Sequence, residues 1–123
     1  AGISRAVLLR GGEVVDGTEL ARERRPAART DRDLARGPAR LCSALGLDRS
    51  DDGALLGGPG SRISLTLPEA RRAPDPARIR SGPRTGVAGP GGDGSSFPWR
   101  FWLYNEPTVS PYRPAAPRRR RQD

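Results

Sequence analysis

Apolar residues along the chain gather in short clusters that are separated by polar, glycine-rich or proline-rich stretches. RAVLLR (5–10) is a continuous apolar run with an arginine at each end, which is typical of a buried strand. SRISLTL (61–67) alternates apolar with polar residues and predicts a half-buried strand. Ile79 together with RTGV (84–87) predicts a further strand, and FPWRFWLY (97–104) predicts the last one.

Two other segments have the spacing of amphipathic helices. DGTELARERR (16–25) begins with residues that can cap a helix, and Pro26 ends it. LARGPARLCSALGLDR (34–49) predicts the longer helix, with Pro38 in the first turn and Gly46 as its C-terminal stop. The order strand, helix, helix, strand, strand, strand indicates an α+β fold rather than a regular alternation of strands and helices.

The last predicted strand holds every aromatic residue of the chain except Tyr112. Aromatic residues interleaved with arginine are compatible with a stacking platform for nucleic-acid bases. Alternation along a strand places on one face Phe97, Trp99, Phe101 and Leu103, and on the other Arg100, Trp102 and Tyr104. Because the first face is fully apolar, we expect it to pack into the core rather than against bases.

The apolar content is low for a chain of 123 residues. Leu, Ile, Val and Phe make up 22 of these residues, and Gly and Pro make up 29, which is close to the composition of chains that do not fold. The length suits one domain at most. Since the sequence also starts without methionine and soon enters an apolar run, we expect it to fold marginally alone or to be part of something larger.

The net charge of +8 comes from 22 basic residues that are all arginine. A GC-rich genome explains the absence of lysine but not the positive excess, so a polyanion is the expected partner. The Arg-rich end, 114–123, has the composition of a disordered tail, and 1–113 is expected to form the folded part. No apolar run reaches the length of a membrane span, and no signal peptide is visible.

Cys42 is the single cysteine, so the chain has no internal disulfide. Its place on the apolar face of 34–49 predicts a small buried side chain rather than a nucleophile. With one cysteine and no histidine, we expect no metal site in this chain.

Three stretches occur in an order and at a spacing that resemble one family. VLLRGGEVVDGTELARERR (7–25) resembles its strand-and-helix pattern, and LARGPARLCSALGLDRS (34–50) resembles its most specific segment. RTGV, PWRFWL and PTVSPY (84–87, 98–103 and 107–112) resemble its C-terminal motif. The family is that of the alkyladenine-type 3-methyladenine DNA glycosylases. The resemblance covers nearly the whole chain, but only the C-terminal portion of the family's domain.

The resemblance implies part of a single mixed domain, built on a curved antiparallel sheet with flanking helices. It also implies DNA repair by base excision, in which an alkylated purine such as 3-methyladenine is flipped out of the duplex and its N-glycosidic bond is hydrolysed. In the family a glutamate activates the water, and no metal or nucleotide cofactor is needed. That glutamate belongs to a segment upstream of this sequence, so we expect the chain alone to be inactive.

The resemblance assigns site roles to five residues. Arg10 matches an arginine that helps to hold the nucleophilic water and the flipped nucleotide, and the backbone carbonyl of Thr85 matches a contact to the same water. Gly37, Arg40 and Arg49 match positions that bind DNA, with arginine where the family has lysine. From the residues alone, the three arginines are equally compatible with solvated charges at the ends of elements.

The expected partner is therefore double-stranded DNA that carries alkylated bases. The resemblance and the composition together suggest a monomer in the bacterial cytoplasm that is associated with the nucleoid through DNA. Two alternatives stay open, namely a non-catalytic basic module that binds nucleic acid, and a degenerate remnant that no longer folds.

Overall fold

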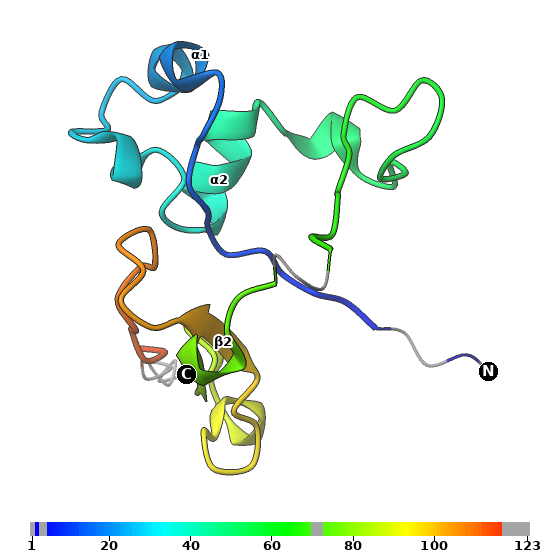
Figure 1. Cartoon of the computed structure of the whole chain (residues 1–123). Helices are drawn as coiled ribbons and strands as arrows, with labels where there is room; N and C mark the ends of the chain where they lie inside the picture. Colours follow the sequence, from blue (N-terminus) through cyan, green and yellow to red (C-terminus); the bar gives the residue numbers. More distant parts are fainter. Residues whose placement is uncertain (1, 3–4, 70–72, 117–123) are drawn as a thin grey trace, which may run out of the picture. The chain divides into compact units, whose positions relative to one another are not determined.

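The computed structural model describes residues 2, 5–69 and 73–116 (Figure 1). Its contacts divide the chain into two compact units. The helical unit comprises Ala1–Ala73 and Pro107–Ser110, and the sheet unit comprises Pro74–Glu106 and Pro111–Asp123. Most of the predicted Arg-rich tail, 117–123, lies outside the described residues.

Helix α1, Thr18–Arg24, confirms the helix predicted at 16–25. It begins after Gly17, whose φ of 67° lies in the left-handed region that glycine adopts without strain. Glu19 lies in the first turn and two arginines lie in the last. This distribution of charge complements the helix dipole and stabilises the short helix.

Helix α2, Pro38–Leu45, forms inside the segment predicted as helical, 34–49. Its proline occupies the first turn, as predicted, and Gly37, with a φ of 130°, prevents the helix from starting earlier. Gly46 ends the helix with a φ of 68°. The amides of Gly46 and the next residue donate back to the last turn at 3.1 and 2.9 Å, which satisfies carbonyls that the helix leaves unpaired.

The core of the helical unit lies where α1 and α2 contact each other (Figure 1). The buried apolar residues in the described ranges are Ala21, Leu34, Ala35 and Ala44. Cys42, which was predicted to be buried, is exposed. The reason is that only a narrow stripe of α2, which contains Leu41 and Ala44, packs on this core, and Cys42 lies beside that stripe.

The two apolar segments of the helical unit do not form strands. The predictions for 5–10 and 61–67 are wrong in this structure, since neither segment joins a β-ladder. Val7, Leu8 and Leu67 are 88%, 66% and 80% exposed. A strand persists only when its backbone groups are paired along a ladder and its apolar side chains are covered, and in the described part of the chain no neighbouring strand pairs with either segment.

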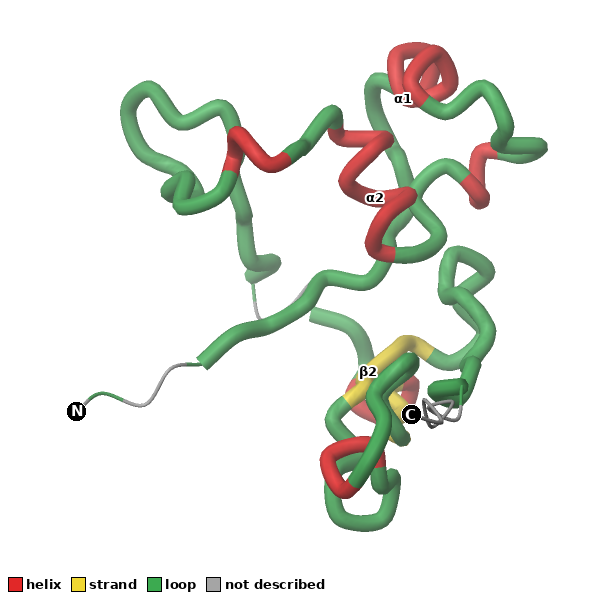
Figure 2. The backbone as a smooth tube through the Cα atoms, turned by 180° about the vertical axis from the view of Figure 1, so that it is seen from behind, coloured by secondary structure: helices red, strands yellow, loops and turns green. Residues whose placement is uncertain are grey.

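The sheet unit contains an antiparallel pair of strands, β1 (Ile79–Gly82) and β2 (Arg100–Leu103). Figure 2 shows how short both strands are beside the loops that surround them. β2 confirms a strand within 97–104. The strand predicted to continue through 84–87 is instead a turn there, in which Gly86 has a φ of 73°.

The faces of this sheet are reversed relative to the prediction. Phe101 is 67% exposed and Trp99 is 59% exposed, whereas Arg100 is buried and Trp102 is half-buried. The guanidinium of Arg100 stacks on the ring of Trp102 at 4.4 Å, which is a favourable cation–π contact. The same ring lies 3.2 Å from the point where a Cβ of Gly82 would be, so the glycine makes room for it.

The described elements form a mixed α+β fold, as the sequence predicts. Among the residues that the structure describes, no helix is long and apolar enough to cross a membrane.

Candidate functional site

The segment that follows Arg10 packs against the start of helix α2. The amide of Gly12 donates a hydrogen bond to the carbonyl of Ala35 at 3.2 Å. A Cβ on Gly11 would lie 2.9 Å from the carbonyl oxygen of Ala35 and 3.2 Å from the amide nitrogen of Gly37. The backbone can approach this closely only because Gly11 has no side chain.

A third segment, 107–110, packs against the segment after Arg10 and against the residues before α2. The carbonyl oxygen of Thr108 would lie 3.5 Å from a Cβ on Gly11, and Thr108 is buried. The Nε of Arg36 donates to the carbonyl of Val109 at 3.1 Å, and its Nη1 lies 3.7 Å from a carboxylate oxygen of Asp33. We call the meeting point of 10–12, 35–37 and 108–109 the glycine junction.

Arg10 and Gly37, two of the predicted site residues, lie at this glycine junction. Arg10 is half-buried, and Gly37 precedes the first residue of α2. Arg40 is exposed in the first turn of the same helix. Unpaired amides and the helix dipole favour an anion at a helix start, and arginine forks bind phosphate oxygens in pairs. The start of α2, with Arg40 in its first turn, can therefore attract a phosphate or a sugar-phosphate group.

Asp33 moderates the positive charge beside the start of α2. The hydroxyl of Thr30 donates to its carboxylate at 2.8 Å. This hydrogen bond first, and then the nearby charges of Arg36, Arg32 and Arg40, lower the pKa of Asp33. The carboxylate is therefore ionised at neutral pH and acts as a counter-charge within the arginine cluster.

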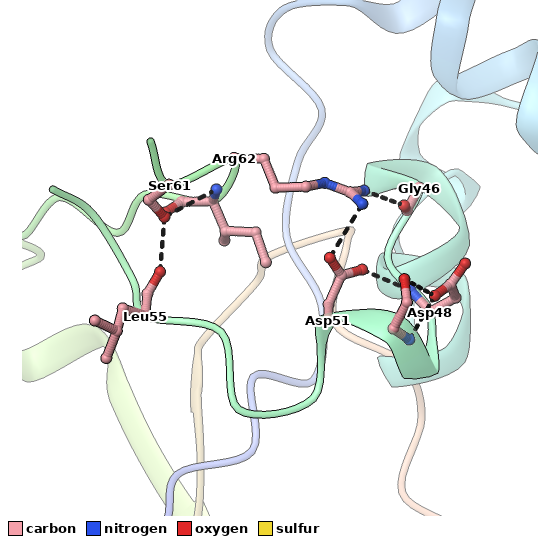
Figure 3. Close-up of polar contacts among 8 residues, drawn as sticks. Gly46, Asp48, Asp51, Leu55, Ser61 and Arg62 are labelled. Atoms are coloured by element: carbon pink, nitrogen blue, oxygen red, sulfur yellow. Dashed lines mark hydrogen bonds and ion pairs between the residues drawn. The ribbon is translucent and has the colours of Figure 1, made fainter. Parts of the chain in front are cut away.

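Arg49 lies at the other end of α2, as the first residue of the 3₁₀ helix η2 (Arg49–Asp51). Figure 3 shows the polar contacts that fix this turn. Arg62 donates to the carbonyl of Gly46 at 2.9 Å and pairs with Asp51 at 3.1 Å. A carboxylate oxygen of Asp51 in turn accepts from the amide of Asp48 at 2.9 Å.

The side chain of Arg49 is exposed, with no ion pair inside the described ranges. Arg40 lies in the first turn of α2, and Arg49 follows its C-terminal end. The two arginines therefore belong to opposite ends of a helix of eight residues, which is about 12 Å long.

Thr85 lies in the sheet unit, whereas the four other predicted site residues lie in the helical unit. It belongs to the turn that replaces the predicted strand, and its hydroxyl is buried without a hydrogen-bond partner in the described structure. The preceding residue, Arg84, fixes this turn. Its Nη2 donates to the carbonyl of Gly91 at 2.5 Å, and its guanidinium lies 5.6 Å from the centre of the Trp99 ring.

The carboxyl groups with shifted pKa values are all stabilised as anions. Hydrogen bonds from the hydroxyls of Ser96 and Ser95 lower the pKa of Asp93 to about 2, and those from Ser50 lower the pKa of Asp48. A general acid or base near neutral pH needs the opposite shift. In the described ranges, no three His, Cys, Asp or Glu side chains are grouped so that they could hold a metal ion.

Sequence reasoning missed Gly11, Arg36 and Thr108. Gly11 and Gly12 directly follow Arg10 in the sequence. A glycine pair directly after a predicted site arginine is the signal that could have indicated a close backbone approach.

The sequence model of the methylpurine-DNA glycosylases (MPG) matches residues 1–107. The chain belongs to this family. The first two stretches of the glycine junction lie within the match, and the third follows its end directly.

Several relatives of the chain share one name. A protein of Streptomyces avermitilis named "Putative 3-methyladenine DNA glycosylase" is 55% identical over 98% of the chain and 54% of its own length. Proteins with the same name from Leifsonia xyli subsp. xyli and Mycobacterium tuberculosis are 52% and 44% identical, over 92% and 91% of the chain. The chain spans about half the length of these relatives.

Proposed function

We propose that this chain is part of a DNA glycosylase that removes alkylated purines such as 3-methyladenine from double-stranded DNA. The damaged base is flipped out of the duplex, and water displaces it from C1′ of the sugar by hydrolysis of the N-glycosidic bond. A damaged base costs less to unstack than an intact one, which contributes to the choice of lesion.

The observation that carries this proposal is the family match over residues 1–107. The names of the relatives support it, and so does the net charge of +8, which suits a polyanion such as DNA. The glycine junction adds a physical argument, since the glycine pair that directly follows Arg10 packs against the anion-attracting start of α2.

Each site residue has a role in the proposed reaction. Arg10 holds the attacking water and the sugar-phosphate of the flipped nucleotide through its fixed N–H donors. The backbone carbonyl of Thr85 accepts a hydrogen bond from the same water. Gly37, Arg40 and Arg49 bind DNA phosphates and thereby fix the register of the protein on the duplex.

The proposed hydrolysis also needs a general base to deprotonate the water. The glutamates of the helical unit are exposed on loops and on α1, namely Glu13, Glu19, Glu23 and Glu69. The base is therefore supplied by the half of the enzyme that this chain does not match, and the chain alone is inactive. The complete enzyme acts as a monomer, without metal or cofactor, on nucleoid DNA in the bacterial cytoplasm.

Base release from methylated duplex DNA tests this proposal. We expect no release by the chain alone. We expect release of 3-methyladenine by a chimaera in which the chain replaces the matching part of the Streptomyces avermitilis relative. Arg10→Ala in the chimaera should lower the rate by about 10²-fold or more, the lower end of what the loss of one oriented hydrogen-bond donor costs an active site.

Arg29→Ala is the matched control, because Arg29 is exposed and belongs to neither the junction nor α2. A chimaera that folds and binds methylated duplex DNA but releases no base contradicts the proposal. That outcome would favour a non-catalytic module that binds nucleic acid.

A further inference from the structure

Arg36 joins the start of helix α2 to a segment far along the chain. Its Nε donates to the carbonyl of Val109, 73 residues away, at 3.1 Å. Its Nη1 lies 3.7 Å from one carboxylate oxygen of Asp33, and the other oxygen of that carboxylate accepts from the hydroxyl of Thr30 at 2.8 Å. A chain of polar contacts therefore runs from Thr30 through Asp33 and Arg36 to Val109.

The segment 107–110 depends on such contacts for its place. It forms a turn rather than a helix or a strand, and it belongs to the helical unit although the residues on both sides of it belong to the sheet unit. A short turn has no regular ladder of backbone hydrogen bonds, so tertiary contacts determine where it lies. The hydrogen bond from Arg36 is one of these contacts.

Arg36 is connected in this way to two of the groups that surround Gly11. The carbonyl oxygens of Ala35 and Thr108 lie 2.9 and 3.5 Å from the Cβ position of Gly11. Ala35, whose carbonyl also accepts from the amide of Gly12 at 3.2 Å, directly precedes Arg36 in the sequence. The side chain of Arg36 holds the segment that contains Thr108.

The packing around Gly11 matters for Arg10, the residue before it. Two consecutive glycines leave a backbone with many accessible conformations, so Gly11 and Gly12 alone would not fix the direction of the chain at Arg10. The close neighbours of Gly11 remove that freedom. A catalytic donor is effective only when it is held in place before the reaction, and the contact made by Arg36 contributes to this hold.

The surroundings of Arg36 differ from those of the proposed phosphate contacts. Its side chain is only 30% exposed, whereas Arg40 and Arg49 are exposed. Two of its guanidinium nitrogens face protein oxygens, and the carboxylate of Asp33 offsets its charge. These are the features of a residue that supports a site from behind rather than one that binds DNA.

We infer that Arg36 is a positioning residue for the proposed reaction. By holding 107–110 against the glycine junction, it fixes the direction in which the backbone presents Arg10 to the flipped nucleotide. This inference rests on the proposed function, because it concerns the role of Arg10 there. It adds to that function a residue that contacts neither the DNA nor the attacking water.

Base release by the chimaera with the Streptomyces avermitilis relative tests the inference. Arg36→Ala should lower kcat by about 10- to 10²-fold, since a displacement of about 1 Å at a positioned group can cost 10²-fold, and should leave KM for the duplex unchanged. The double variant Arg36→Ala, Arg10→Ala should be no slower than Arg10→Ala alone. A positioning residue has no further effect once the group that it positions is removed.

Arg32→Ala is the matched control. Arg32 is exposed and its charge also acts on Asp33, so the variant removes the same charge nearby but keeps the hydrogen bond to Val109. It should release base at the unchanged rate. If Arg36→Ala does not fold, Arg36→Lys is measured with the same expectations, because it keeps the charge and lacks the Nε–H group.

Two measurements on the full chain alone are independent of catalysis. Hydrogen exchange of the Gly12 amide, followed by NMR, should become about tenfold faster or more in Arg36→Ala, because the junction opens locally. Exchange of the amides in α1 should not change. The slope of log K against log salt concentration for duplex binding should also stay the same, whereas a phosphate contact contributes about 0.9 to it.

Four results would overturn the inference. They are an unchanged kcat in Arg36→Ala, a further loss of rate in the double variant, unchanged exchange of the Gly12 amide, and a fall of about 0.9 in the salt slope. The last would make Arg36 a phosphate contact. Each of them leaves the proposed function intact, as long as the unchanged chimaera releases base. An unchanged chimaera that releases no base contradicts the proposed function itself, and the role of Arg36 toward Arg10 fails with it.

Discussion

At the scale of single residues, Gly11 determines how closely three backbone segments approach one another. Its missing side chain allows the carbonyls of Ala35 and Thr108 and the amide of Gly37 to lie within 3.5 Å of the Cβ position. These neighbours are backbone atoms, which cannot rotate away as the end of a flexible side chain can. The position therefore tolerates glycine alone.

We predict that Gly11→Ala lowers the free energy of unfolding of the helical unit by about 1–3 kcal/mol, the usual cost of overpacking a tight site. Gly12→Ala is the control, since a Cβ there would meet no atom within 4 Å. Urea denaturation followed by far-UV circular dichroism measures both. Equal stability of the two variants would contradict the close approach at the junction.

At the scale of elements, Arg24 links the end of α1 to the end of α2. Its Nη1 donates to the carbonyl of Ala44 at 3.1 Å, and its guanidinium carbon lies 2.8 Å from the Cβ position of Gly46. A cation at a helix C-terminus also interacts favourably with the helix dipole. One side chain thus combines a hydrogen bond, a charge effect and packing on a glycine.

We predict that Arg24→Ala destabilises the helical unit by roughly 1 kcal/mol, the typical net value of one such hydrogen bond. Thermal unfolding measured by circular dichroism at 222 nm should show a lower midpoint. Arg29→Ala removes the same charge from an exposed site and should leave the midpoint nearly unchanged. An equal shift in both variants would mean that net charge, rather than the contact with α2, is responsible.

The helices could be predicted from the sequence because their signals are local. The proline at the start of α2 and Gly46 at its end determine the helix without reference to distant residues. The state of 5–10 and 61–67 could not be predicted in this way. Whether a segment forms a strand depends on a pairing partner elsewhere, which its own sequence does not specify. The reversed face of β2 has the same origin, since Gly82 on another segment decides which side accommodates Trp102.

The candidate site shows the same difference between local and distant information. Arg10 and Gly37 were assigned from motifs, and the structure brings both to the glycine junction. Thr108 was not predicted to belong to the site, because its close approach to Gly11 joins residues that are far apart in the sequence. Composition could not reveal it either, since the contact is made by backbone atoms.

At the scale of the whole molecule, charge dominates the expected behaviour with DNA. The chain carries +8, and arginines that displace counterions from phosphates make binding depend on salt. Arg40 and Arg49 are the proposed phosphate contacts, and both are exposed. Arg22, by contrast, is already paired with Asp31 at 2.5 Å, so less of its charge is available to a phosphate.

We predict that replacing Arg40 and Arg49 together by alanine lowers the steepness of the salt dependence. Each phosphate contact contributes about 0.9 to the slope of log K against log salt concentration, so the double variant should lose about 1.8. Fluorescence anisotropy with a labelled duplex, measured over a series of salt concentrations, gives the slope. Arg22→Ala should change it much less, because its guanidinium is held by a carboxylate. If all three arginines contributed equally, affinity for DNA would follow net charge alone, and neither Arg40 nor Arg49 would be a specific contact.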